Sequence, residues 1–452
     1  MIRYLSLSEA DRTSMLADIG VESVDDLFRD VPKTVYHSTP FTGLSSHQGE
    51  IEVEQYLSSL AAKNRPTSSL SSFLGAGAYR HHIPAAVDSL IQRGEFLTSY
   101  TPYQSEISQG TLQALFEFQT HVALITGMEI ANASMYDGLN ACVEGVLMAN
   151  RLTKRDHVVL SGGLHPHYRD GLITYARFTG FQVESAAPDP DDHEVLQTML
   201  TERTSCVVVQ NPSVFGHLRD VSELAKACHA QGALLMVVVT EIVSLGLLSS
   251  PGEMNADIVV AEGQSLGNPL MFGGPYLGLF ATRHIYMRQM PGRLCGQTQD
   301  RDQRRSFTLT LSAREQHIRR ERATSNICTN AGLCALAFTI HVSLLGEIGL
   351  RRLAEINHAK AINLADRLAE IDGLTVINQS FFNEFTVRLP CPAANLVTTL
   401  AKDHHLFAGV PVSRLFPDYP LLNNLLLIAV TELNTSNDMD NLCHALSDLI
   451  NR

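Results

Sequence analysis

Short apolar runs alternate with helical patterns between residues 73 and 330, and this alternation constrains the fold most strongly. The runs are rich in Val, Ile or Leu and lie at 157–160, 206–209, 234–239, 257–260 and 277–281. Runs of this length and composition are typical of strands that are covered on both faces. The segments between them have helical patterns. This order predicts βαβ units, a mostly parallel sheet and therefore the α/β class.

The domain organisation follows from where these patterns begin and end. We expect an N-terminal helical arm at 1–72, a large domain at 73–330 and a small C-terminal α/β domain at 331–452. A chain of 452 residues can bury a large core, so a large domain with a smaller one appended is reasonable.

Local signals place several helices and strands within these domains. Ser8 and Asp11 have the spacing of a helix capping box. A long helical region at 331–371 is interrupted by Gly346 and Gly349, and the last helix, at 438–450, has Ser436 as its expected cap. The small domain also contains short apolar runs that predict strands, at 374–377, 384–389 and 425–430.

Charge argues against a nucleic-acid partner. The formal net charge is −13, whereas phosphate binding needs concentrated Lys and Arg. The Arg-rich stretch at 301–322 is the basic exception. Only 18% of the residues are charged, which fits a chain whose surface is largely hidden in its core or against another subunit.

Cysteine spacing and the terminal sequence indicate a cytoplasmic protein. The eight cysteines form no C-x-x-C pair and no Cys/His cluster with zinc spacing, so we expect no metal site. We find no apolar run of transmembrane length and no apolar signal core, so we expect no membrane association. A reducing, prokaryotic cytoplasm is the expected location.

The segment 257–278 has the layout of an active-site loop, because a buried strand runs into a Gly-rich turn. In pyridoxal-phosphate (PLP) enzymes of the aminotransferase-like class, a lysine at the end of such a strand forms the Schiff base. Here the nearest candidate is Ser265, which cannot form an imine, and no lysine lies between 227 and 359. Either this is not a PLP protein, or it has a PLP fold and leaves the chemistry to a partner.

Two polar loops are candidates for an active-site mouth or a subunit contact. One contains Tyr79, Arg80 and His81 after a Gly-rich turn, and the other, 99–110, is dense in hydrogen-bonding side chains. Simple turns would need Gly but not this density of polar groups. Thr101, Tyr103 and Gln104 are the residues of the second loop that we favour.

Three further segments have both a functional and a structural interpretation. Ser134–Asn140 opens a helix whose N-terminus has the chain position of a phosphate cup, or is simply capped by Ser134 or Asp137. Glu241 follows a strand where PLP enzymes carry an Asp, and we interpret it as a structural carboxylate. His165 and His167 lack an evident third metal ligand.

The run from Arg314 to Asn330 is the densest polar stretch of the chain. Glu315 and Arg319 have the spacing of a pair on a helix surface, so a solvated helix is the plainest interpretation. The Thr-Ser-Asn-Ile that follows does not suit a free surface, which favours arginines that pair with carboxylates across a subunit interface. Arg314, His317 and Arg320 are the candidates here.

Together these segments closely resemble the P-protein family of the glycine cleavage system, in particular the alpha subunits of its two-chain form. The strings that carry the resemblance occur in the family's order: Phe73-Leu-Gly-Ala-Gly-Ala-Tyr79, Tyr100-Thr-Pro-Tyr-Gln104, Gly263-Gln-Ser-Leu-Gly267, Phe272-Gly-Gly-Pro-Tyr276, Arg314-Glu-Gln-His-Ile-Arg-Arg-Glu321, Ala323-Thr-Ser-Asn-Ile327 and Val430-Thr-Glu432.

The resemblance implies the fold, the reaction and the partners. It implies aminotransferase fold type I, with a seven-stranded type of sheet. It implies that a beta subunit carries the lysine and PLP, that this chain has serine there, matching Ser265, and that it binds no cofactor covalently. The complex would decarboxylate glycine and pass the aminomethyl group to the lipoyl arm of H-protein.

Two alternatives stay open at this point. One is a self-sufficient PLP enzyme that uses an unexpected lysine, for which Lys154 and Lys226 lie nearest the sheet. The other is a catalytically silent scaffold or regulatory protein that kept the fold, which the fold alone does not exclude.

Overall fold

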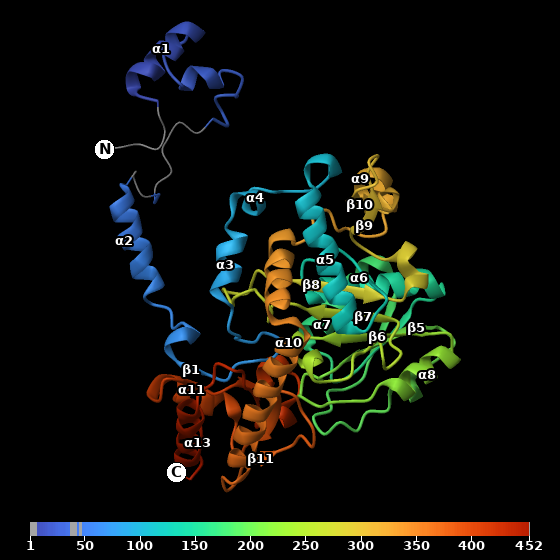
Figure 1. The fold of residues 1–452 in the computed structure, drawn as a ribbon. Coiled ribbons are helices and arrows are strands. Elements are labelled where there is room, and N and C mark those ends of the chain that lie inside the picture. Colours follow the sequence, from blue (N-terminus) through green and yellow to red (C-terminus); the bar gives the residue numbers. More distant parts are fainter. Residues whose placement is uncertain (1–6, 37–42, 45–47, 452) are drawn as a thin grey trace. The chain divides into compact units, whose positions relative to one another are not determined.

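The computed structural model describes residues 7–36, 43–44 and 48–451, which belong to two compact units, Met1–Ser69 and Leu70–Arg452 (Figure 1). The helices of the first unit are α1 (Glu9–Ile19) and α2 (Glu50–Ala61), with single turns η1 (Asp25–Phe28) and η2 (Thr67–Ser69). The capping box of α1 is confirmed, since Ser8 and Asp11 bond each other's backbone N–H groups. Within the described residues of this unit, no side chain is buried.

In the described part of the second unit, a central sheet of seven strands has the order β2-β8-β7-β6-β5-β3-β4. The strands are β2 (Ile130–Ala131), β3 (His157–Leu160), β4 (Gln182–Ser185), β5 (Thr204–Gln210), β6 (Leu234–Val239), β7 (Ile258–Glu262) and β8 (Gly278–Thr282). Strands β3 to β7 are mutually parallel, whereas β8 is antiparallel to β7 and β2 to β8. The five expected strands and the mostly parallel sheet are confirmed.

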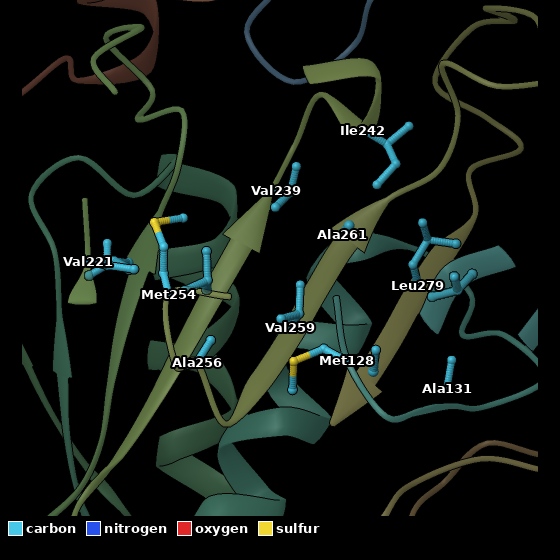
Figure 2. Close-up of a cluster of buried hydrophobic side chains, with 14 of the residues drawn as sticks. Met128, Ala131, Val221, Val239, Ile242, Met254, Ala256, Val259, Ala261 and Leu279 are labelled. Atoms are coloured by element: carbon cyan, nitrogen blue, oxygen red, sulfur yellow. The ribbon is translucent and has the colours of Figure 1, made fainter. Parts of the chain in front are cut away.

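Helices cover both faces of this sheet, which explains the apolar strands. Helices α6 (Gly138–Thr153) and α7 (Pro166–Thr179) contribute to one core, together with strand residues such as Leu160. Helices α5 (Gln109–Thr126) and α8 (Ser222–Ala230) contribute to the other, with Val159 of the same strand. Figure 2 shows part of this second core, where Val239, Val259 and Leu279 come from three neighbouring strands.

Helix α10 (Gly332–Ala369) also packs on the second core, through Phe338 and Val342. Its backbone is not helical at Gly346 (φ 60°, ψ −173°), as predicted, whereas the second predicted interruption, Gly349, is wrong because its backbone is helical. Contrary to the sequence expectation, α10 is long and apolar enough to cross a membrane. Its contacts with α5 and η5 (Ile242–Gly246) are instead those of a core helix.

The C-terminal part of the described chain contains a four-stranded sheet of order β11-β12-β15-β14. Its elements are β11 (Thr375–Val376), β12 (Glu384–Arg388), α11 (Ala393–Asp403), β14 (Val410–Pro411), α12 (Val412–Leu415), β15 (Leu425–Ala429) and α13 (Ser436–Ile450). The cap of α13 is Thr435, not Ser436, because Thr435 and Asp438 form a capping box.

The run from Arg314 to Asn330 does not form the solvated helix of the plainest interpretation, since it contains only the four-residue helix α9 (Gln316–Arg319) between single turns. The Arg-rich stretch at 301–322 begins in the antiparallel hairpin of β9 (Leu294–Gln299) and β10 (Arg305–Thr310), to which it contributes β10. The Glu315–Arg319 pair is also not formed in this way, since Arg319 Nε donates to the carbonyl of Ala313 at 3.2 Å. The carboxylate of Glu315 instead faces Arg293.

The remaining described elements are short and connect these layers: β1 (Ser71–Ser72) paired with β13 (Leu406–Phe407), α3 (Ala85–Ile91), α4 (Gly94–Leu97), η3 (Ser105–Ile107), η4 (Leu196–Met199), η6 (His284–Gln289), η7 (Ser312–Arg314), η8 (Arg320–Arg322) and η9 (Pro420–Leu422).

The cap of α13 can be tested with two adjacent substitutions. Thr435→Ala removes the hydroxyl that accepts the Asp438 N–H, so the free energy of unfolding should fall by about 1 kcal/mol. Ser436→Ala should change it by a few tenths at most, because the Ser436 side chain is exposed and does not cap. Denaturant unfolding of both variants measures this, and equal losses would contradict the assignment.

Candidate functional site

Polar side chains gather where the parallel strands end. His165, Gln210, Glu241 and Glu262 follow or end β3, β5, β6 and β7, and all four are buried. The carboxyl ends of parallel strands meet at one edge of a sheet, which is where ligands bind in open α/β folds. This edge is therefore the candidate site.

His81 joins this edge to two other parts of the chain. Its Nε2 lies 2.9 Å from Glu241 Oε2 and its Nδ1 lies 2.9 Å from Glu432 Oε2. Burial alone would lower the pKa of His81, but the charges and hydrogen bonds of the two carboxylates outweigh it and raise the pKa to about 10. The His81 side chain is therefore an imidazolium held between two carboxylates.

Glu432 responds in the opposite direction. Burial would raise its pKa, but the bond to His81, the charge of His81 and the backbone N–H of His82 lower it to about 2. Glu432 is thus ionised in the folded chain over the usual pH range.

Glu384 and Tyr79 form a second buried pair beside this one. Glu384 accepts the Tyr79 hydroxyl at 2.8 Å and the backbone N–H of Ala76 at 2.6 Å. Burial raises the pKa of Glu384 to about 7, although both hydrogen bonds act to lower it. Burial and nearby carboxylates raise the pKa of Tyr79 well above its ordinary value, so Tyr79 stays protonated and donates.

Glu262 occupies the N-terminal end of α6. Its carboxylate accepts the backbone N–H of Gly138 at 2.9 Å and that of Leu277 at 2.8 Å, and burial raises its pKa to about 7. Asp137 caps the same helix by accepting the N–H of Asn140 at 2.6 Å. The hydroxyl of Tyr168 also crowds this place, since a Cβ on Gly138 would lie 2.2 Å from it.

These residues do not fit PLP. The position after β7 is Ser265, which is buried and cannot form an imine. At the helix end that was expected to bind a phosphate, the N–H groups of Gly138 and Asn140 are already bonded to Glu262 and Asp137, so neither is available for one. Glu241, at the chain position where PLP enzymes carry an Asp, is already hydrogen-bonded to His81.

The two histidines after β3 have structural partners. His165 accepts the N–H of His167 as the cap of α7, and its Nε2 lies 3.0 Å from the Ala76 carbonyl oxygen. Burial and the neighbouring His167 lower the pKa of His165 to about 4. Among the described residues, no group of three or more His, Cys, Asp or Glu side chains is placed to hold a metal ion.

A second cluster surrounds Arg293. The Arg293 guanidinium donates to the Tyr103 hydroxyl at 2.9 Å and lies beside the Glu315 carboxylate, with Nε to Oε2 at 3.4 Å. The ring of His317 meets that of Tyr103 edge-on, with centroids 5.7 Å apart. Arg314 lies next to this cluster and donates to the Gly292 carbonyl at 2.8 Å.

The structure divides the residues expected from sequence between these two places. Tyr79, Arg80 and His81 belong to the strand-end network, where the Arg80 carbonyl accepts the Thr431 hydroxyl at 2.8 Å. The others belong to the Arg293 cluster or its surroundings: Thr101, whose hydroxyl oxygen is buried, Tyr103, Arg314 and His317, with Gln104 and Arg320 exposed.

Sequence reasoning missed five residues of the two clusters: Glu262, Arg293, Glu315 as the Arg293 partner, Glu384 and Glu432. Glu432 stands in a string that carries the family resemblance, which was a signal, although it gave no role. Glu262 lies two residues beyond the predicted strand 257–260 and ends the observed β7, and a charged residue there was a further signal. Arg293 has no local pattern around it.

The sheet order, with one antiparallel strand beside the last parallel one, and the strand-end site define the fold type I class of PLP-dependent enzymes. The same fold occurs in a sphingosine-1-phosphate lyase of Burkholderia pseudomallei, with a TM-score of 0.64 and 14% identity over 92% of this chain and 93% of the lyase.

Within that class, the chain belongs to the glycine cleavage system P-protein family, whose model matches residues 2–446. A crystal structure of glycine decarboxylase (P-protein) in inhibitor-bound form is similar over 99% of this chain and 100% of that chain, with a TM-score of 0.90 and 42% identity. A relative from Rhodospirillum centenum, named "Probable glycine dehydrogenase (decarboxylating) subunit 1", is 64% identical over 99% of this chain and 100% of its own length.

The raised pKa of Glu384 predicts a pH dependence of stability. Its folded-state pKa of about 7 exceeds the ordinary 4.5, so unfolding releases a proton above pH 4.5 and stability falls until the pH passes 7. Glu384→Gln mimics the neutral form and removes this loss, which we expect to be about 3 kcal/mol between pH 5 and 8.

Denaturant unfolding of the wild-type chain and the variant at several pH values measures the difference. Glu347→Gln, on an exposed side chain of α10, is the control and should leave the wild-type slope unchanged. Parallel pH profiles for Glu384→Gln and wild type would show that Glu384 is ionised in the folded chain.

Proposed function

We propose that this chain is the subunit of glycine dehydrogenase (decarboxylating) that does not carry the cofactor, in a two-chain P-protein. Its membership of the P-protein family and its likeness to "subunit 1" relatives support a subunit role. The observation that best supports a subunit without the cofactor is the set of side chains after β7 and at the start of α6. Ser265 stands at the lysine position, and carboxylates occupy the end of α6.

The partners follow from this role. A beta subunit, subunit 2, supplies the lysine and PLP, and the two chains assemble as an α2β2 heterotetramer in the bacterial cytoplasm. The complex removes CO2 from glycine and transfers the aminomethyl group to the lipoyl arm of H-protein, for which PLP on the partner supplies the electron sink. This chain alone is inactive.

The residues of this chain take no part in the chemical steps; they stabilise the chain's own fold and its contacts with the partners. Tyr79, Arg80 and His81 hold the strand-end network that shapes the chain's own buried edge. Four exposed residues, Tyr103, Gln104, His317 and Arg320, would contact the beta subunit or H-protein, and the partly buried Thr101 and Arg314 would support them. Tyr103 is 53% exposed and its hydroxyl oxygen accepts a hydrogen bond from Arg293, which suits a contact residue whose position is fixed.

Reconstitution with the beta subunit tests the proposal. The beta subunit alone should show little glycine decarboxylation, and adding this chain should restore it. Borohydride reduction of the mixture with PLP, followed by peptide mass spectrometry, should find the pyridoxyl-lysine on the beta subunit. An adduct on Lys154 or Lys226 would instead make this chain a PLP enzyme in its own right. Full activity of the beta subunit alone would show that this chain is not needed for turnover and would favour a scaffold or regulatory role for it.

A charge reversal tests the surface contact. Arg320→Glu lies on an exposed turn, so the chain should fold normally while its affinity for the beta subunit falls about tenfold. Titration of the beta subunit with this chain, with turnover as the signal, measures the affinity. Arg203→Glu is the matched control on another exposed segment and should bind as wild type does. Unchanged affinity of Arg320→Glu would remove Arg320 from the interface.

A further inference from the structure

Arg293 is the largest fully buried side chain of the described chain, with 1% exposure. Its Nη2 donates to the Tyr103 hydroxyl at 2.9 Å and also to the backbone carbonyl of Cys328. The guanidinium carbon lies 4.8 Å from the centroid of the Tyr103 ring, which is a cation–π contact. A buried guanidinium is costly unless its charge and N–H groups are matched, and these contacts offset part of that cost.

Three segments that are far apart in sequence meet on this one side chain. Tyr103 lies in the loop before α5, Glu315 directly precedes α9, and Cys328 lies just before α10. Each of them contacts the Arg293 guanidinium. Arg293 therefore fixes the position of Tyr103 relative to Glu315 and Cys328.

The cluster has more buried donors than acceptors. Within the described part of the chain, three buried donors of the cluster lack a hydrogen-bond partner: Arg293 Nη1, Arg314 Nε and Arg314 Nη1. One buried acceptor, Glu315 Oε1, also lacks a partner. Two guanidinium groups against one carboxylate also leave the cluster positive. A group that suits such surroundings is an anion.

Tyr103 and His317 are the members of the cluster that reach the surface, and Tyr103 is the one that Arg293 contacts directly. Its hydroxyl oxygen accepts a hydrogen bond from Arg293, so its own O–H stays available to donate. A cation on the oxygen polarises that O–H and makes it a stronger donor. The cluster thus presents one directed donor, backed by positive charge, at a side chain that is 53% exposed.

We propose that Tyr103 donates a hydrogen bond to an anionic group bound by the partner subunit, a carboxylate or a phosphate, and that Arg293 is the positioning residue that holds Tyr103 for it. The proposal rests on the function proposed above. Two molecules could provide this anionic group: glycine through its carboxylate, and PLP through its phosphate.

The experiment compares complexes of the beta subunit with the wild-type chain, Tyr103→Phe, Arg293→Lys and the double variant. Tyr103→Phe keeps the ring and removes the hydroxyl, so one constant should rise about tenfold, the loss of one hydrogen bond to a charged group. A rise in KM for glycine assigns the group to the substrate carboxylate. A rise in the Kd of PLP, from an absorbance titration, assigns it to the cofactor phosphate.

The double variant separates positioning from a merely structural role. If Arg293 acts through Tyr103, Arg293→Lys should raise the same constant, and the double variant should be no worse than the worse single variant. Arg169→Gln is the matched control, because Arg169 also lies over an aromatic ring, that of Phe416 at 5.8 Å, and pairs with Asp170 at 3.0 Å. It should leave both constants unchanged.

Two results would overturn the proposal. Wild-type constants for Tyr103→Phe, in a complex that assembles and turns over glycine, would exclude the donated hydrogen bond while leaving the proposed function intact. Additive effects in the double variant would exclude positioning by Arg293. Tyr103→Phe changes a half-exposed side chain and decides the first point even where Arg293→Lys does not fold. A wild-type chain that does not activate the beta subunit would overturn both proposals together.

Discussion

The imidazolium of His81, held between Glu241 and Glu432, is the interaction on which the organisation of the large unit depends. It joins the loop before α3 to the end of β6 and to the segment after β15. Because helices cover both faces of the central sheet, polar groups concentrate at its carboxyl edge, where they must neutralise one another. Removing either carboxylate would leave a buried charge with one partner fewer, a strongly destabilising change.

This ion-paired group tolerates a wide range of pH. The folded-state pKa of His81, about 10, lies above the ordinary 6.5, so its contribution to stability is complete below 6.5 and is lost as the pH rises toward 10. That of Glu432, about 2, lies below the ordinary 4.5, so its contribution is complete above 4.5 and is lost as the pH falls toward 2. Both contributions are therefore complete together between pH 4.5 and 6.5.

The sequence predicts features that follow from a local pattern, such as buried strands, but not contacts between residues that are far apart in the chain. The central strands were recognised because a strand buried on both faces must be apolar, whereas β4 escaped notice because its residues Gln182–Ser185 are largely exposed and polar. Tyr79 and His81 were found from the polar content of their loop. Their partners Glu384 and Glu432 lie 305 and 351 residues away, and Tyr103 lies 190 residues from Arg293, so no local pattern connects them.

The carboxylate at the start of α6 has a consequence for the evolutionary history of such a chain. A lysine placed at Ser265 would find Glu262 bonded to the helix end that a phosphate needs and Glu241 bonded to His81. Replacing Glu262 or Glu241 alone would in turn disrupt a buried hydrogen-bond network. The side chains at this strand end are thus epistatically coupled, so a Schiff-base lysine at position 265 would need changes at Glu262 and Glu241 together.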